Sequence, residues 1–133
     1  MFKQKTMVLV AAVLAVAVVG CAVPAFASYR SVGYVNGWLG TGDWEWIGAD
    51  LYSGRQYKIT LSVPWSADFD VKVYYDKNRN GIAESSELIA KGTRGTGLDE
   101  SFTFVPRYTG RYHIKVYSYS GSGFYTLSLY KWV

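Results

Sequence analysis

The chain contains very few of the residues that form disulfide cross-links or bind transition metals. Its 133 residues include one cysteine, one histidine and three prolines. A single cysteine cannot form a disulfide within the chain, and a zinc site needs several cysteine, histidine or carboxylate ligands. No G-x-S-x-G nucleophile motif accompanies the lone His113. We therefore expect His113 to be an exposed residue on a sheet. We also expect that the protein is not an enzyme.

Runs of positive charge are also absent, because the lysines and arginines are scattered singly along the sequence. The formal charge of +4 becomes +2 once Lys3 and Lys5 are set aside as part of a leader. Nucleic acids and anionic membrane surfaces attract proteins through clustered positive charge. We therefore expect neither nucleic acid nor anionic lipid as the main partner.

The N-terminal residues have the pattern of an export signal. Lys3 and Lys5 form a basic start, residues 7–19 are an unbroken apolar run, and Ala25-Phe26-Ala27 is an A-x-A cleavage site. The apolar run is shorter than the roughly 20 residues that a membrane-spanning helix needs. We expect residues 1–27 to be a signal peptide, residues 28–133 to form a single domain, and the protein to be secreted.

A second interpretation of the same segment is open. The run Val18-Val19-Gly20-Cys21 resembles the lipobox of bacterial lipoproteins. Cleavage before Cys21 would leave that cysteine lipidated and the domain anchored to the cell surface, which is the one circumstance in which we expect a membrane partner.

The rest of the sequence alternates between apolar and polar residues over short runs, the pattern of antiparallel strands with one buried face. Glycine, asparagine, aspartate and serine separate the runs. The pattern predicts an all-β fold, an antiparallel β-sandwich that is jelly-roll-like. Strands are expected over residues 44–49, 57–63, 69–75, 87–91, 101–105, 112–117 and 125–129, with a helical turn within 83–90 as an alternative to the fourth of them.

Residues 76–87 have the ligand spacing of a twelve-residue calcium loop. Oxygen ligands stand at positions 1, 3, 5, 9 and 12, a backbone carbonyl at position 7 and a glycine at position 6, where the chain must turn. The predicted metal ligands are Asp76, Asn78, Asn80, Ile82 (through its carbonyl), Glu84 and Glu87. The alternative is an ordinary hairpin turn in which Asn80-Gly81 supplies positive φ. Calcium is the cofactor that we expect.

Aromatic residues are abundant, with twelve tyrosines and five tryptophans. Exposed flat rings suit stacking on sugars or contact with an extended polypeptide. Outward or loop positions are predicted for Tyr74, Tyr117, Tyr119, Phe124 and Tyr130, and Trp38, Trp44 and Trp46 lie in the glycine-rich N-terminal part. We expect Lys115, Tyr117 and Tyr119 to contact a ligand. The alternative is that Trp44 and Trp46 belong to the core, tyrosine being a good strand former.

Asp68 and Asp70 lie two residues apart and so share one face of a strand. With Asp43, or with Asp99 and Glu100, they could form a second acidic site. We favour the simpler interpretation, a solvated strand end.

Five sequence segments in a fixed order resemble the bacterial pre-peptidase C-terminal domain. They are residues 43–46 (DWEW), 54–61 (GRQYKITL), 67–74 (ADFDVKVY), 109–116 (TGRYHIKV) and 122–129 (SGFYTLSL). The resemblance covers about residues 43–130. It implies a β-sandwich with jelly-roll-like topology and a non-catalytic accessory module of exported proteins, related to the collagen-binding domains of clostridial collagenases.

Together these observations predict a secreted, non-catalytic module. It would bind an extracellular polymer or protein, collagen-like or polysaccharide, through an aromatic sheet face, and it would carry one calcium ion. The alternative is a surface-tethered structural module that packs on a partner protein.

Overall fold

The computed structural model describes residues 4–8 and 27–133. These described residues form nine strands and one short 3-10 helix. The elements are β1 (Gln4–Val8), β2 (Tyr29–Leu39), β3 (Trp44–Leu51), β4 (Tyr57–Ser62), β5 (Asp68–Tyr75), η1 (Ser85–Glu87), β6 (Leu88–Gly92), β7 (Glu100–Phe104), β8 (Gly110–Ser120) and β9 (Gly123–Trp132). No helix in the described part of the chain is long and apolar enough to cross a membrane.

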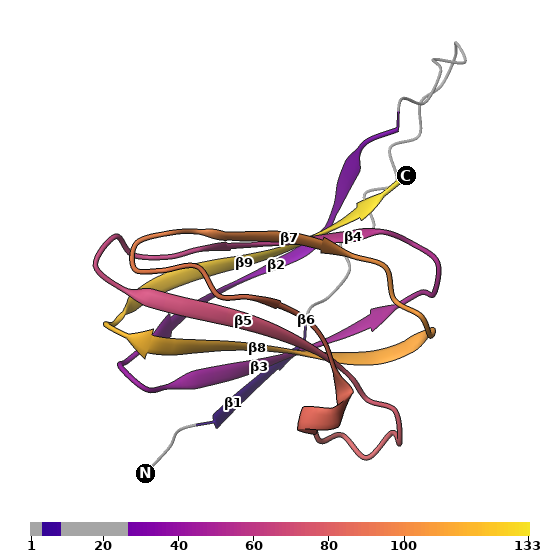
Figure 1. The fold of residues 1–133 in the computed structure, drawn as a ribbon, viewed down its shortest axis with the longest axis horizontal. Coiled ribbons are helices and arrows are strands. Elements are labelled where there is room, and N and C mark those ends of the chain that lie inside the picture. The colour runs from indigo at the N-terminus through magenta and orange to yellow at the C-terminus, as the bar shows by residue number, and fades with distance from the viewer. Residues whose placement is uncertain (1–3, 9–26) are drawn as a thin grey trace.

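The strands form two stacked sheets, which Figure 1 shows as a lower and an upper layer. Sheet A has the order β1-β3-β8-β5-β6, and sheet B has the order β2-β9-β4-β7. From β2 to β9 every neighbouring pair is antiparallel. The chain passes from one sheet to the other at every connection after β2 except that between β5 and β6, which is the jelly-roll arrangement. The predicted β-sandwich is confirmed.

The core lies between the sheets and consists of the apolar residues of the alternating runs. Ile47, Ile59, Val73, Ile114 and Leu127 are fully buried. Burial of each large aliphatic side chain contributes roughly 1.5–3 kcal/mol relative to exposure. The expected strand faces are therefore correct, because the same alternation that predicts each strand also assigns its residues to the interior.

Strand β2 was not predicted, because glycines interrupt its alternation. A register shift between Ser31 and Gly33 breaks the period-two pattern as well. Gly37 explains why an apolar residue is missing from this strand. A Cβ atom at Gly37 would lie 2.6 Å from the ring of Tyr125 on the neighbouring strand β9. The glycine thus makes room for a large core side chain on the adjacent strand.

Strand β1 pairs in parallel with β3, from Gln4 opposite Trp44 to Val8 opposite Gly48. It lies at the outer edge of sheet A in Figure 1. The predicted leader, residues 1–27, contains this strand, while Cys21 lies outside the described residues. Cleavage after Ala27 remains a prediction. A chain cleaved there would lack β1 and would have β3 as the edge of sheet A.

Glu45 is an acidic side chain that enters the core. Glu45 lies on β3, faces sheet B and is 3% exposed. The hydroxyl of Tyr125, on β9, donates a hydrogen bond to its Oε2 atom across the sandwich. Burial, together with this neighbouring carboxylate, raises the pKa of Tyr125, so the phenol keeps its proton and remains a donor. A buried carboxylate needs such a donor because it has left water.

Candidate functional site: a polar loop beside an aromatic sheet face

The loop between β5 and η1 is built around the carboxylate of Asp76. Asp76 is 3% exposed. Its Oδ1 accepts a hydrogen bond from the backbone N–H of Asn80 at 3.2 Å, and its Oδ2 accepts one from that of Gly81 at 2.9 Å. Positive φ values at Arg79 (55°) and Gly81 (75°) turn the chain back toward this carboxylate. The first residue of the predicted calcium loop thus organises its sharp turn.

Four other predicted ligands are drawn together around this turn. The amide groups of Asn78 and Asn80 both donate to Oε1 of Glu84, at 3.3 and 3.0 Å. Glu87 is buried and closes the loop, because it accepts hydrogen bonds from the backbone N–H groups of Lys77 (2.7 Å) and Glu84 (3.0 Å). Positions 3, 5 and 9 of the motif are therefore in mutual contact, and position 12 holds the two ends of the loop together.

The fit of this loop to calcium is partial in the arrangement that the structure shows. Within residues 4–8 and 27–133, no three histidine, cysteine, aspartate or glutamate side chains gather as metal ligands. Calcium prefers six to eight oxygen ligands, among them carboxylates, amide oxygens and backbone carbonyls. The donor set has the required chemistry, but Asn78 and Asn80 would have to turn their amide oxygens inward to coordinate an ion. The side chain of Ile82, the predicted carbonyl ligand, is 61% exposed.

His113 connects the loop to sheet A. Its Nε2 atom lies 3.1 Å from Oδ2 of Asp76. The prediction that His113 is an exposed sheet residue is wrong, since its side chain is only 14% exposed. It points outward as predicted, but the loop and the edge of Trp46 cover it (ring centroids 6.5 Å apart).

The electrostatics of Asp76 suit a metal ligand. Burial raises the pKa of its carboxyl group, but hydrogen bonds from His113 and from the backbone N–H groups of Gly81 and Asn80 outweigh burial. The net effect is a pKa below the ordinary value for aspartate. Asp76 is therefore ionised at neutral pH, as a calcium ligand must be.

The outer face of sheet A carries an aromatic group beside this loop. Trp44 lies opposite Tyr117 and Trp46 lies opposite Lys115 on the paired strands β3 and β8. The ammonium group of Lys115 lies over the rings of Trp44, Trp46 and Tyr117, at 5.2, 5.5 and 5.6 Å from their centroids. Both tryptophans are partly exposed, so the interpretation that they belong to the core is wrong.

The three predicted contact residues all lie on the outer face of β8. Lys115 and Tyr117 join the tryptophan group, and Tyr119 is 74% exposed two residues further along. Tyr74 also points outward, but it is only 8% exposed and packs edge-on against Trp46 at 5.6 Å. The predicted outward position is therefore correct, but the ring of Trp46 covers the side chain.

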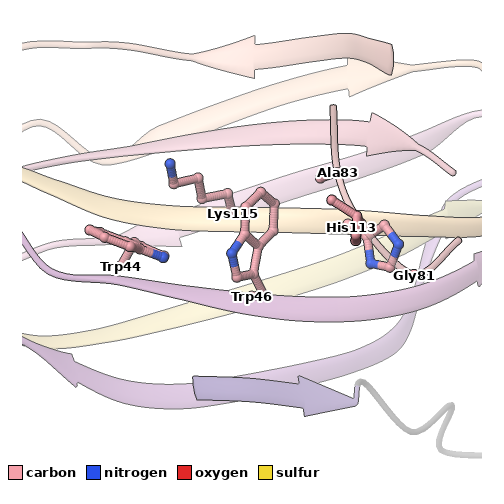
Figure 2. Close-up of a pocket in the computed structure, with 7 residues that line it drawn as sticks. Trp44, Trp46, Gly81, Ala83, His113 and Lys115 are labelled. Atoms are coloured by element: carbon pink, nitrogen blue, oxygen red, sulfur yellow. The ribbon is translucent and has the colours of Figure 1, made fainter. Parts of the chain in front are cut away.

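A pocket of about 420 Å³ lies where the loop meets the aromatic face. Figure 2 shows Trp46 and Lys115 on one side, and Gly81, Ala83 and His113 on the other. The lining residues are Trp44, Trp46, Gly81, Ile82, Ala83, His113 and Lys115. The sequence did not reveal this juxtaposition, since the lining residues of the loop are at least thirty residues away from those of β3 and of β8. The lining residues of β3 and β8 share one sequence signal: each occupies an outward-facing position in the alternation of its strand.

The acidic residues suggested as a second site divide into two sets. Asp68 and Asp70 each have a buried Oδ1 atom without a hydrogen-bond partner among the described residues. Burial raises the pKa of Asp70, and Asp68 raises it further. Burial likewise raises the pKa of Glu100, and the negative charges of Asp70 and Asp68 raise that pKa further. Asp43 and Asp99 instead accept hydrogen bonds from backbone N–H groups in turns, at 3.2 and 3.0 Å.

Comparisons with known proteins identify similar structures. No protein-family model and no curated protein sequence matches the chain. Among solved structures, the pre-peptidase C-terminal domain of a collagenase from Bacillus anthracis is similar, with a TM-score of 0.62 and 15% identity over 97% of this chain and 96% of that one. The periplasmic inhibitor of g-type lysozyme from Aeromonas hydrophila has a TM-score of 0.54 and 16% identity over 98% of both chains.

A surface-associated copper-binding protein of Methylomicrobium album BG8 is also similar, with a TM-score of 0.52 and 12% identity over 72% of this chain and 92% of that one. At these identities the likeness concerns the fold. It agrees with the resemblance drawn from the five sequence segments. The chain has the β-sandwich fold of a bacterial collagenase's pre-peptidase C-terminal domain.

Proposed function

We propose that the protein is an exported, non-catalytic binding module that contacts an extracellular polymer or protein through the outer face of sheet A. A calcium ion held by residues 76–87 stiffens the loop at one end of that face. The observation that carries this proposal is the shared pocket, because one cavity is lined both by Trp44 and Trp46 and by Gly81–Ala83.

The contact between Asp76 and His113 gives a physical route from the ion to the pocket. His113 lines the pocket, and its partner Asp76 is the first residue of the loop motif. An ion that fixes Asp76, Asn80 and Gly81 therefore fixes one wall of the cavity. A preformed cavity binds more tightly than a mobile one, because less ordering entropy is lost on binding.

An extracellular setting suits a weak calcium site. Extracellular calcium modules have dissociation constants of about 10⁻⁴–10⁻³ M. Proteins of this fold include one that is periplasmic and one that is surface-associated, which is consistent with the predicted export. The inhibitor among them has a protein partner, so a protein ligand is as consistent with the fold as a polymer.

The calcium half of the proposal is tested by thermal unfolding in EDTA, calcium and magnesium. Calcium at one hundred times its dissociation constant should add about 2.7 kcal/mol to the free energy of unfolding. Glu84→Gln and Asn80→Ala should weaken this gain, because they remove ligand oxygens at an exposed part of the loop. Asp50→Asn is the matched control, since it removes an exposed carboxylate elsewhere. Equal unfolding temperatures in EDTA and ~10 mM calcium would contradict a calcium site.

The binding half is tested by retention on insoluble collagen, chitin and cellulose. Trp46→Ala should reduce retention, because Trp46 lines the pocket. Trp38→Ala is the control, since Trp38 is 50% exposed on sheet B, away from the pocket. Equal retention of both variants and the wild type would mean that the outer face of sheet A is not the binding surface.

A second candidate function is a surface-tethered assembly module. The observation that favours it is an aromatic pair on sheet B, where Trp38 (50% exposed) and Phe124 (78% exposed) lie opposite each other on β2 and β9. Contiguous exposed apolar surface marks protein contacts, and two facing aromatic rings provide the start of such a surface. Mass spectrometry that finds a diacylated or triacylated Cys21 would support tethering, and an unmodified N-terminus at Ser28 would contradict it.

A further inference from the structure

Three lysines form a straight row across the outer face of sheet A. Lys115 on β8 lies opposite Lys72 on β5, and Lys72 lies opposite Lys91 on β6. Trp46 on β3 continues the same row beyond Lys115. Adjacent strands lie about 4.8 Å apart, so the row places one lysine backbone position on each strand at about that spacing.

Among residues 4–8 and 27–133, no ion pair holds these ammonium groups. In the described residues, ion pairs join Arg111 to Asp50 and His113 to Asp76, and none involves the three lysines. Asp70, on the neighbouring row, interacts electrostatically with Lys72, but its carboxylate is buried. Like charges directly opposite one another on a sheet are destabilising. Burial and the charge of Lys72 both lower the pKa of Lys115, which reflects this unfavourable placement.

Aromatic rings line the row. Lys72 lies 5.2 Å from the centroid of Tyr117, and Lys115 lies over Trp44, Trp46 and Tyr117. The site is thus a strip of positive charge with ring surfaces beside it, on the outer face of sheet A. A peptide that recognises a sheet through backbone hydrogen bonds needs a free edge. A stiff polymer with a repeated negative charge can bind to this face without access to a sheet edge.

Resting on the function proposed above, we propose that the row of Lys72, Lys91 and Lys115 binds an anionic polysaccharide, one that carries carboxylate or sulfate groups. The chain crosses the strands, and its acidic groups meet the lysines in succession. Its sugar rings contact Trp46 and the neighbouring aromatic residues. Charge complementarity selects this ligand over a neutral polymer, because a neutral polymer would leave the lysine row unpaired.

The test uses the exported protein with four soluble probes at about 0.15 M ionic strength. Dextran sulfate and polygalacturonate carry sulfate and carboxylate groups respectively, dextran is uncharged, and poly-glutamate is an acidic polypeptide. Calorimetry should show binding to one or both anionic glycans and none to dextran. Lys72→Gln/Lys115→Gln should weaken this binding about tenfold, a loss consistent with two partly exposed charge contacts.

A matched control separates the row from net charge. Lys58→Gln/Lys131→Gln removes the same number of charges from sheet B, and Lys58 also lies over tyrosine rings, at 4.6 Å from Tyr29 and 5.0 Å from Tyr130. This variant should bind as the wild type does. An equal loss in both double variants would overturn the proposal, because binding would then depend on net charge alone.

Two further outcomes would overturn the inference. Poly-glutamate bound as tightly as the glycans would show that the strip does not recognise sugars. Retention on a neutral polymer that depends on Trp46, with no binding to anionic glycans, would refute the lysine row and leave the proposed binding function intact. Unfolding curves of both double variants establish that each is folded.

Discussion

Replacing Tyr125 by phenylalanine removes one oxygen atom from the core and should destabilise the protein strongly. The ring of Tyr125 is 2% exposed and packs edge-on against Phe69 with centroids 6.4 Å apart. Phenylalanine preserves this packing. It removes the hydroxyl that donates to Glu45, and Glu45 is itself 3% exposed.

The size of the effect follows from what remains after the change. A hydrogen bond to a charged group contributes about 1.5–3 kcal/mol, and leaving a buried acceptor unsatisfied costs about 1–3 kcal/mol, or more when it is charged. We expect Tyr125→Phe to lower the free energy of unfolding by about 3 kcal/mol. For a domain of this size, this corresponds to a fall in the unfolding temperature on the order of 10 °C or more.

Denaturant unfolding of a double-mutant cycle measures this directly. Glu45→Leu/Tyr125→Phe removes both polar partners, and it should recover much of the stability that Tyr125→Phe loses, since no unpaired carboxylate remains. A loss below about 0.5 kcal/mol in Tyr125→Phe would refute the reasoning, because surface-like substitutions have effects of that size. It would show that the buried carboxylate does not depend on the tyrosine.

Three further outcomes can be checked with the same unfolding assay. Gly97→Ala should cost at least about 2 kcal/mol, because Gly97 has φ +72° and a Cβ atom there would lie 2.5 Å from the carbonyl oxygen of Trp65; wild-type stability would contradict that backbone conformation. Burial raises the pKa of Glu100, so the wild type should lose stability relative to Glu100→Gln as the pH rises from about 4 to 7, and a constant difference would contradict the raised pKa. Asp50→Asn should change stability by less than about 1 kcal/mol, since the ion pair of Asp50 with Arg111 has side chains 71% and 41% exposed; a larger loss would show a role beyond that pair.

The strands were predictable from sequence wherever alternation and burial coincide. In β4, β5, β8 and β9 the apolar residue of each pair enters the core, so one pattern predicts both the element and its orientation. The pattern fails at β2, where Gly37 occupies a core-facing position because a Cβ atom there would collide with the ring of Tyr125 on another strand. A local sequence window does not contain that ring.

The candidate site was predictable only in part, for a related reason. The loop motif is local, and the contacts of Asp76 with Asn80 and Gly81 follow from spacing along the chain. The contact of Asp76 with His113 depends on strand pairing. The lysines, which are isolated in the sequence, become a row only when β8, β5 and β6 align. Clustering across strands is a property of register, and composition alone does not reveal it.

Strands β2 and β9 are paired to their ends. Ser28 and Val133 exchange backbone hydrogen bonds, with N–H to O distances of 3.1 and 3.0 Å. The start of β2 and the end of β9 are therefore adjacent, as the two ends are in domains that tolerate insertion and circular permutation. A short glycine–serine linker could join residue 133 to residue 28, with new termini in the exposed loop at Gly95, where an added Cβ meets no atom within 4 Å. Such a permuted protein would start and end in the connection between β6 and β7 and would still present the outer face of sheet A. The sandwich can therefore serve as a movable unit within a longer polypeptide.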